Sequence, residues 1–427
     1  MTRHLTPTTV GIVGGGPAGL MLSHLLAISG IGSVVIDHRS RLEIEHTVRA
    51  GILETDSVRL LAESGVSDRV HRDGHAHQGI ALRFGGVSHR IDFTGLVGAS
   101  VWLYPQTDVF IDLADARARD GGDVRFGVRD TRVVDVTADR PGVLFTDADG
   151  VEHEVRCDYL VGADGSRSIC RLEIPEPERR HYFREYPFAW LGIIAEAPKS
   201  APELVYNHSA RGFALISQRT DTQQRMYLQC DPDEDADAWS EDHIWAELQA
   251  RVAGTDGFAL TPGPILEKTV LRFRSFVAEP MRYGNLLLAG DAAHTVPPTG
   301  AKGLNLALAD VRVLAEVLER AVQKNDTGAL DQYGPRALAR VWRSQHFSYW
   351  MTTMLHTLPG ATDFDVRRQL AELESVAGSN AGQTYLAEGY TGWPIPAGSG
   401  PHLETTLRRR RLRDRLDPER AMPRSRR

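Results

Sequence analysis

The sequence predicts an α/β protein, α+β overall, in which a parallel-sheet domain is interrupted by an antiparallel sheet and followed by helices. A strand, a glycine-rich turn and a helix near the amino terminus predict the parallel sheet, as does the apolar run that begins at Leu286 and stops at Gly290-Asp291. Short strand patterns between residues 181 and 276 predict the antiparallel sheet, with one of its faces covered.

The amino-terminal unit is typical of a Rossmann-like βαβ dinucleotide site. An apolar strand precedes GGGPAG at 14–19, a helical pattern follows, and a second apolar run ends at Asp37. Gly14, Gly16 and Gly19 allow the turn and a close approach to pyrophosphate, while the helix start supplies N–H groups and a positive dipole end. Asp37 follows at the spacing of the carboxylate that binds ribose hydroxyls.

Two later strands also end in acids. One apolar run ends at Asp164-Gly165, and another ends at Gly290-Asp291, before prolines, glycines and a new helical pattern. Asp-Gly alone usually marks only a turn. An acid at the carboxyl end of a strand, facing a helix start, lies where open α/β sheets bind cofactors.

The remaining elements follow from periodicity and capping residues. The domains are assigned to residues 8–180 and 277–325 (nucleotide-binding), 181–276 (inserted sheet), 326–395 (helical) and 396–427 (basic extension). Inside the insertion, strands are expected at 188–195, 203–208, 212–217 and 225–230, and a helix capped by Ser240 at 239–252. Helical patterns elsewhere cover 58–61, 109–118 and 304–318.

Composition narrows the class of protein. The chain has 427 residues, 42% of them apolar and 25% charged, which is ordinary for a globular protein with two or three domains. No apolar run is long enough to span a bilayer, and no signal peptide is visible, so we expect a cytoplasmic protein without membrane contact. Cys157, Cys170 and Cys230 have no metal-like spacing and fit a reducing compartment.

The carboxyl-terminal extension is strongly basic. Residues 402–427 contain ten arginines and four acids, whereas the whole chain has a net charge of −7. One basic tail on an acidic body does not make a nucleic-acid-binding domain, so no nucleic-acid partner is expected. We interpret the extension as a disordered or dimer-contacting segment.

Taken together, the glycine turn, Asp164-Gly165 and Gly290-Asp291 resemble the single-component flavoprotein aromatic hydroxylases, from about Val10 to Pro394. More specific segments carry the same resemblance: Arg49-Ala50-Gly51, Gly212-Phe213-Ala214-Leu215, Ser217-Gln218-Arg219 and His294 to Ala307. The resemblance implies bound FAD, NAD(P)H as hydride donor, O2 as oxygen source through a flavin C4a-hydroperoxide, and a homodimer.

The resemblance also assigns residues to the cofactor. FAD is expected on the glycine turn, with the adenosine ribose at Asp37, the pyrophosphate and ribityl chain at Arg49, Gln106 and Asp291, and the flavin ring beside Arg225. The helix after Pro298 is expected to point its N–H groups at the ring. The other residues expected at the cofactor are Asp164, Gly300, Leu304 and Asn305.

The substrate is expected to be a small aromatic carboxylate. Ser217 and Arg219 point to one face of a strand, and an arginine binds a carboxylate through two parallel hydrogen bonds. By spacing alone these are common strand residues; the resemblance places Ser217, Arg219 and Tyr227 together at the carboxylate-binding positions. Trp190 is expected to help wall the pocket. The resemblance also implies that Tyr206 and Tyr390 form a pair at the substrate hydroxyl.

The resemblance implies that Tyr390 passes the proton to His77 and that the Pro298 carbonyl faces the substrate oxygen. The neighbouring histidines, His71 and His75, do not complete a metal site. The reaction implied is hydroxylation of 4-hydroxybenzoate at position 3 to give 3,4-dihydroxybenzoate.

The hydride donor is the least settled feature. Arg39, Arg167 and Arg274 are expected at NAD(P)H. Glu43 and Thr47, however, stand where NADPH-using relatives carry aromatic and basic residues, and a carboxylate there repels the 2′-phosphate. We therefore expect NADH or dual use.

Three alternatives stay open on the sequence. The same clamp accepts another para-substituted benzoate, such as 4-aminobenzoate. A flavin reductase or dehydrogenase without oxygen insertion has no need of the relay formed by Tyr206, Tyr390 and His77. A non-catalytic protein on this fold has lost the flavin, which the intact glycine turn and both acidic motifs argue against.

Overall fold

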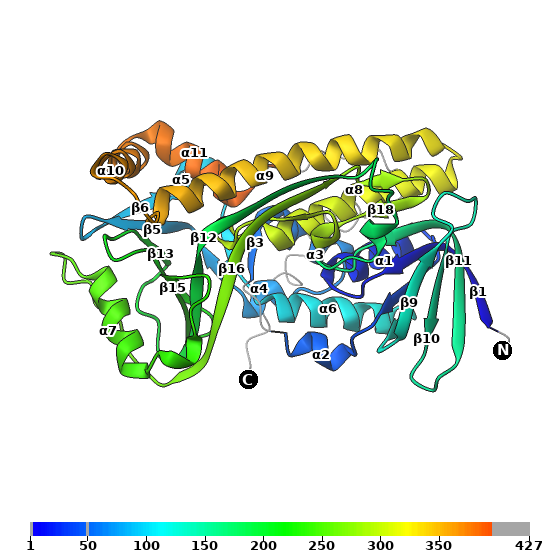
Figure 1. The fold of residues 1–427 in the computed structure, drawn as a ribbon, viewed down its shortest axis with the longest axis horizontal. Coiled ribbons are helices and arrows are strands. Elements are labelled where there is room, and N and C mark those ends of the chain that lie inside the picture. The colour runs from blue at the N-terminus through cyan, green and yellow to red at the C-terminus, as the bar shows by residue number, and fades with distance from the viewer. Residues whose placement is uncertain (1–2, 48–50, 395–427) are drawn as a thin grey trace, which may run out of the picture.

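The computed structural model describes residues 3–47 and 51–394, so Arg49 and the basic extension lie outside the described residues. Two large sheets and a layer of long helices make up the described part (Figure 1). This arrangement confirms the predicted fold class. No helix in the described ranges is long and apolar enough to cross a membrane.

The first sheet carries the nucleotide-binding motifs. Its strands follow the order β17 (Arg282–Tyr283), β18 (Leu286–Leu288), β11 (Glu152–Gly162), β1 (His4–Val13), β2 (Ser33–Asp37) and β8 (Asp123–Phe126), with β9 (Arg129–Val134) and β10 (Gly142–Thr146) added beside β11. The strands from β18 to β8 are parallel. Their carboxyl ends therefore meet at one edge, where the glycine turn and the three acidic motifs lie together.

Helices cover this sheet because each has an apolar face. α1 (Pro17–Ile28) packs against α6 (Gln106–Arg119) and α8 (Gly303–Gln323), and α3 (Thr55–Ser64) also packs on α8. A single core of buried Val, Ile and Leu side chains joins these helices to the strands. The short helix α2 (Arg41–Glu45) lies at the edge of this domain (Figure 1), and the short helix α4 (Arg69–Asp73) follows α3.

The second sheet is larger than the sequence indicated. Its order is β19 (His294–Thr295), β16 (Ile265–Glu279), β12 (Arg180–Glu196), β15 (Gln223–Cys230), β14 (Ala214–Gln218), β13 (Leu204–Asn207), β5 (Gly79–Phe84) and β6 (Val87–Asp92). The four expected strands and the helix capped by Ser240, α7 (Glu241–Val252), are confirmed.

Two features of this sheet differ from the sequence assignment. β5 and β6 come from the segment assigned to the nucleotide domain, because β5 pairs in parallel with β13, more than a hundred residues away. β16, which no pattern predicted, pairs with β12 along nearly its whole length. A small third sheet of β3 (Ile52–Glu54), β7 (Val101–Leu103) and β4 (His75–His77) lies beside them, with α5 (Phe93–Val97) between β6 and β7.

The last helices close the structure over both sheets. α9 (Tyr333–Leu355) runs along α8 and reaches the second sheet, where α10 (Asp363–Gly378) and α11 (Asn380–Thr391) pack (Figure 1). α11 lies close on α9 because Gly389 has no side chain, and a Cβ there would overlap the ring of Phe347. The next residue is Tyr390, so this contact determines how deeply the Tyr390 side chain is buried.

Gly389→Ala is therefore expected to destabilise the protein by about 1–3 kcal/mol, since overpacking forces helices apart. Urea unfolding of the flavin-loaded protein measures this change. Gly378→Ala is the matched control, because a Cβ on that helical glycine meets no atom within 4 Å. Equal stability of the two variants would show that α11 is not seated as described.

Candidate active site

The glycine turn has the geometry of a pyrophosphate cradle. Gly14 has φ +113°, and a Cβ there would overlap the carbonyl of Ala163, while a Cβ on Gly19 would overlap the carbonyl of Gly14. Gly16 differs, because a Cβ there meets no described atom within 4 Å. Gly14 and Gly19 are thus required by close backbone packing, whereas Gly16 leaves open space at the start of α1.

Asp37 is bound to this turn. Its Oδ2 accepts the Gly15 N–H at 2.8 Å, and its Oδ1 accepts the Arg39 N–H at 2.8 Å. The Arg39 guanidinium also contacts the same carboxylate, at 3.2 Å. Arg39, expected at NAD(P)H, is therefore engaged with Asp37 at the end of β2.

Asp164 shapes its own loop. Its carboxylate accepts hydrogen bonds from the Ser168 hydroxyl at 2.6 Å and the Ile169 N–H at 2.7 Å. Arg171, which the sequence did not single out, donates to the carbonyls of Ser166 (2.9 Å) and Ala292 (2.6 Å). It therefore ties the Asp164 loop to the turn that carries Asp291, while a direct contact of Asp164 with the cofactor stays a prediction.

The segment after β18 is held by a buried ion pair. Asp310 of α8 accepts the Gly290 N–H at 2.9 Å and contacts His294 Nε2 at 2.6 Å. Burial lowers the pKa of His294, but Asp310 and Asp291 outweigh it and raise that pKa above its usual value. The turn bearing Asp291 is thus fixed from inside the protein.

The start of α8 is fixed in a similar way. The Asn305 side-chain oxygen accepts the Glu54 N–H (2.9 Å) and the Ser57 hydroxyl (2.7 Å), and its amide nitrogen donates to the Ile52 carbonyl (2.8 Å). Hydrogen bonds within the protein therefore occupy this side chain. The predicted contact of the helix-start N–H groups, including those of Leu304 and Asn305, with the flavin stays a prediction. Gly300 packs against the Phe347 ring and leaves no room for a side chain.

A buried charge cluster, missed from the sequence, lies beneath this helix start. Lys302 Nζ binds Glu54 at 2.7 Å and the Tyr390 carbonyl at 2.8 Å. Arg340 binds the other Glu54 oxygen at 2.9 Å. The cluster joins α8, α9 and the end of α11, and it fixes the main chain at Tyr390.

The predicted substrate residues share one face of the second sheet. Tyr206 pairs with Leu215, and Leu215 pairs with Tyr227, so the three form a row across β13, β14 and β15. Ser217 lies two residues beyond Leu215 and therefore projects from the same face. Trp190 packs against Tyr227 with ring centroids 4.5 Å apart.

The carboxylate end of this face holds two arginines. Arg219 is half-buried, and its Nη1 is buried without a partner among the described residues. Burial and the neighbouring charge of Arg225 lower its pKa. The Arg225 guanidinium lies 5.4 Å from the Tyr227 ring centroid, while the Ser217 hydroxyl donates to the Arg225 carbonyl at 2.6 Å. This end is suited to an anion.

The opposite end holds the tyrosine pair. The hydroxyls of Tyr206 and Tyr390 are 2.6 Å apart, although 184 residues separate them. Tyr206 also donates to the carbonyl of Thr299 at 3.3 Å, whereas the Pro298 carbonyl accepts the Ala301 N–H at 2.9 Å. The carbonyl that contacts Tyr206 is thus that of Thr299, while a contact of the Pro298 carbonyl with the substrate oxygen stays a prediction. Burial raises the pKa of both phenols.

His77 is buried on β4, and its Nδ1 has no hydrogen-bond partner among the described residues. Burial lowers its pKa to about 4, so the ring is neutral at neutral pH. The structure gives His77 the protonation state of a proton acceptor. A relay from Tyr390 to His77 stays a prediction.

Of the residues expected at NAD(P)H, Arg274 lines a cavity and Arg167 lies beside it, whereas Arg39 lies at the end of β2. Arg274 lines a cavity of about 250 Å³ together with Ser166, Arg171, His181, Phe183, Phe276 and Thr295. Arg167 is exposed on the neighbouring loop. Glu43 closes a capping box with Ser40 at the start of α2, and this exposed carboxylate has a lowered pKa because the Ser40 N–H and hydroxyl bind it.

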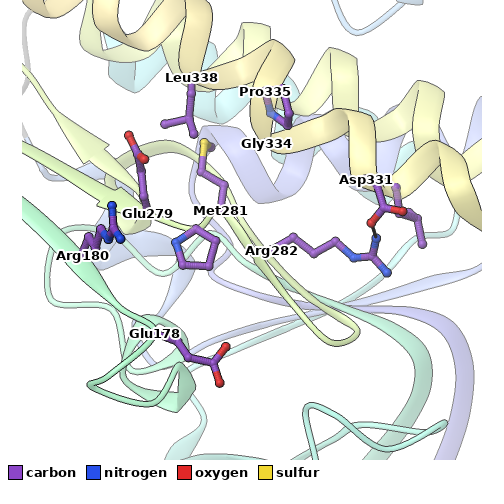
Figure 2. Close-up of a pocket in the computed structure, with 11 residues that line it drawn as sticks. Glu178, Arg180, Glu279, Met281, Arg282, Asp331, Gly334, Pro335 and Leu338 are labelled. Atoms are coloured by element: carbon purple, nitrogen blue, oxygen red, sulfur yellow. Dashed lines mark hydrogen bonds and ion pairs between the residues drawn. The ribbon is translucent and has the colours of Figure 1, made fainter.

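A larger cavity lies elsewhere. It measures about 420 Å³ and opens near the start of β12, between Arg180, Glu279 and the first turn of α9 (Figure 2). Its Arg282–Asp331 ion pair, at 2.5 Å, is internally satisfied. None of its lining residues belongs to the predicted site.

Comparison with known proteins identifies the family. The protein-family model described as "FAD binding domain" matches residues 7–348, so the chain belongs to this family. The p-hydroxybenzoate hydroxylase of Acinetobacter baylyi is 41% identical over 398 residues, which cover 93% of this chain and 98% of that protein. The rifampicin monooxygenase of Streptomyces venezuelae is 29% identical, covering 94% and 82%. The chain is thus an FAD-dependent enzyme of the aromatic hydroxylase type.

Solved structures support the fold. The p-nitrophenol 4-monooxygenase of Pseudomonas putida DLL-E4 has a TM-score of 0.77 at 19% identity, covering 92% of this chain and 100% of that one. Aklavinone-11 hydroxylase in complex with FAD and aklavinone has a TM-score of 0.67 at 24% identity, covering 83% and 70%.

The residues present fit FAD, since the open space at Gly16 lies beside Asp37 and the start of α1. Gly16→Ala is expected to weaken FAD binding about tenfold or more, ~1.4 kcal/mol or more, because the methyl group occupies the space of the pyrophosphate. Flavin fluorescence titration of the apoprotein measures the affinity.

Gly334→Ala is the control, because a Cβ there also meets nothing within 4 Å. Both apoproteins are expected to unfold at the wild-type urea concentration. A folded Gly16→Ala variant with wild-type FAD affinity would contradict this placement of the cofactor.

Proposed function

We propose that the protein is a monooxygenase that hydroxylates 4-hydroxybenzoate at position 3, consuming NAD(P)H and O2 and releasing 3,4-dihydroxybenzoate. The observation that carries the proposal is one sheet face with an unpartnered guanidinium at one end and a hydrogen-bonded tyrosine pair at the other. A para-substituted benzoate has complementary groups at its two ends. The relative with 98% of its length covered is named for this substrate.

The carboxylate end orients the substrate. Arg219 offers an Nη1 that has no partner among the described residues, and Tyr227 lies on the same face with a hydroxyl donor. The Ser217 hydroxyl already donates to the Arg225 carbonyl, which ties Ser217 to β15 beside the clamp. A planar guanidinium holds a carboxylate by two parallel bonds and so fixes the direction of the ring. Trp190 and Phe213, stacked at 5.4 Å, form an apolar wall that excludes water.

The tyrosine end moves a proton. While Tyr206 donates to Thr299, the short contact requires Tyr390 to donate to Tyr206. If the Tyr390 proton turns away, Tyr206 donates to Tyr390 and its lone pair accepts the substrate hydroxyl. The pair then carries the phenolic proton away from the substrate, and neutral His77 is the acceptor beyond Tyr390. Loss of this proton raises the electron density of the ring carbon beside the oxygen.

FAD, when bound, accepts the hydride and activates O2. The Gly16 space, Asp37 and the turn bearing Asp291 would hold it, and Arg225 would position its ring. The cavity at Arg274 and Arg171 is the proposed entry of the nicotinamide donor, since two arginines and two phenylalanine rings suit a pyrophosphate and an aromatic ring. The exposed charge of Glu43 supports NADH or dual use.

Homodimer formation and a cytoplasmic location remain predictions. Exposed aromatic side chains support the first: Tyr182 and Phe183 on β12, and Trp342 and Tyr349 on α9, are each at least 39% accessible. An exposed aromatic surface of this kind is typical of protein contacts.

Anaerobic reduction of the flavin-loaded protein tests the proposal. With NADH, 4-hydroxybenzoate is expected to accelerate reduction strongly, and admission of O2 is expected to yield 3,4-dihydroxybenzoate. Parallel runs with NADPH and with 4-aminobenzoate test the donor and the para substituent. Reduction that ignores the substrate, or peroxide without hydroxylated product, would favour a reductase instead, and a tenfold preference for NADPH would reject the assigned donor.

Arg219→Ala is expected to raise the KM for the hydroxybenzoate substrate about a hundredfold, because it removes one partner of a desolvated charge pair. The KM of Arg219→Lys is expected to lie between those of the wild type and Arg219→Ala, since lysine keeps the charge but loses the two parallel hydrogen bonds. Arg211→Ala, which removes an exposed arginine of the β13–β14 turn that pairs with Glu247 of α7, is the control and should match the wild type. An unchanged KM in Arg219→Ala would overturn the assigned clamp.

A further inference from the structure

Trp190 has a polar contact that its role as an apolar wall does not require. The side chain is 2% exposed and stacks among Phe213, Tyr227 and Phe273. Its Nε1–H donates to Nε2 of His356 at 2.7 Å. Without this acceptor, a buried N–H group would be left unpaired, which costs more than a neutral hydrogen bond contributes.

The second nitrogen of His356 is also used. Nδ1 lies 2.8 Å from the carbonyl of Thr352, one turn earlier on α9. An indole N–H only donates, so Nε2 of His356 accepts and the ring proton resides on Nδ1, which donates to Thr352. Burial lowers the pKa of His356 to about 3, which keeps this neutral tautomer at all working pH values.

The hydrogen bonds that begin at Trp190 continue to the other end of the pocket. Thr352 Oγ1 is hydrogen-bonded to Thr299 Oγ1 at 2.9 Å, and the carbonyl of the same Thr299 accepts the Tyr206 hydroxyl. A buried path through the end of α9 therefore connects Trp190, at the carboxylate clamp, with the turn beside the tyrosine pair. All its side chains are fully or nearly fully buried.

We infer that His356 is a positioning residue of the active site, which holds the Trp190 ring at one orientation and fixes it relative to the Pro298–Gly300 turn. The inference rests on the proposed function, because it takes the space in front of Trp190 as the substrate pocket. A histidine suits this position because it presents an acceptor to the indole and a donor to the helix end, within an aromatic surrounding.

The test compares three variants. His356→Phe fills the space but leaves the Trp190 N–H unpaired, whereas His356→Gln keeps an acceptor near Nε2. His208→Phe is the matched control, since His208 is equally buried nearby but bonds the Leu355 carbonyl instead of Trp190. His356→Phe is expected to weaken substrate binding about tenfold, in both the dissociation constant and KM, with a smaller change in kcat, and His356→Gln is expected to restore most of the affinity.

A double-mutant cycle with Trp190→Phe separates positioning from general packing. If His356 acts through the indole, its substitution changes substrate affinity less than about twofold once Trp190 is already Phe. Additive effects, or an equal loss in His208→Phe, would overturn the inference. Should His356→Phe not fold, the same cycle with His356→Leu, which also removes the acceptor, decides.

A measurement without substrate keeps the two proposals apart. The near-ultraviolet dichroism of Trp190, isolated as wild type minus Trp190→Phe, is expected to be lost in His356→Phe and kept in His208→Phe. If that signal behaves as expected but 4-hydroxybenzoate does not bind the wild type, the proposed function fails while the contact stands. If the substrate binds and the signal persists in His356→Phe, the inference fails alone.

Discussion

The contact of Asp310 with Gly290 and His294 fixes the place where the two sheets meet. The segment it holds leaves β18 of the first sheet, pairs through β19 with β16 of the second, and then opens α8. The same carboxylate accepts a backbone N–H and a histidine whose pKa it raises, so the turn cannot move without exposing a buried charge. Because this segment carries Asp291 at one end and Thr299 at the other, the cofactor side and the substrate side of the site share one anchor.

Local signals predicted the parts of the fold that depend on local structure. The glycine turn, the strand ending at Asp37 and the Ser240 cap each need only neighbouring residues, and each is present. β5 joined the second sheet through a parallel pairing with β13, which no short pattern encodes. β16 was missed because only a few of its side chains are buried, so the strand has little apolar alternation.

The candidate site also contains residues that the sequence pointed to and residues that it did not. The spacing of Ser217 and Arg219 placed both on one face of a strand, but only the resemblance made them a carboxylate clamp. Tyr206 and Tyr390 were likewise paired only through the resemblance, since 184 residues separate them. Thr299, His356, Lys302 and Glu54 were not found. Their importance lies in which buried partner they contact, and a single sequence carries no signal for that. The Gly51 contact with Tyr104 and Gln106 shows that even a recognised motif gains its meaning from a distant chain segment.

The charges of the pocket also bear on the para substituent. One end presents guanidinium groups that stay charged, while burial keeps both phenols at the other end protonated and His77 neutral. A carboxylate is therefore matched only at Arg219, and negative charge at the tyrosine end arises only if a proton leaves through the hydroxyl pair. A phenol supplies such a proton, whereas an aromatic amine does not ionise in this way and would leave the pair idle. In the proposed reaction, the buried hydroxyl pair thus favours a 4-hydroxy over a 4-amino substituent, a distinction that the carboxylate clamp by itself does not make.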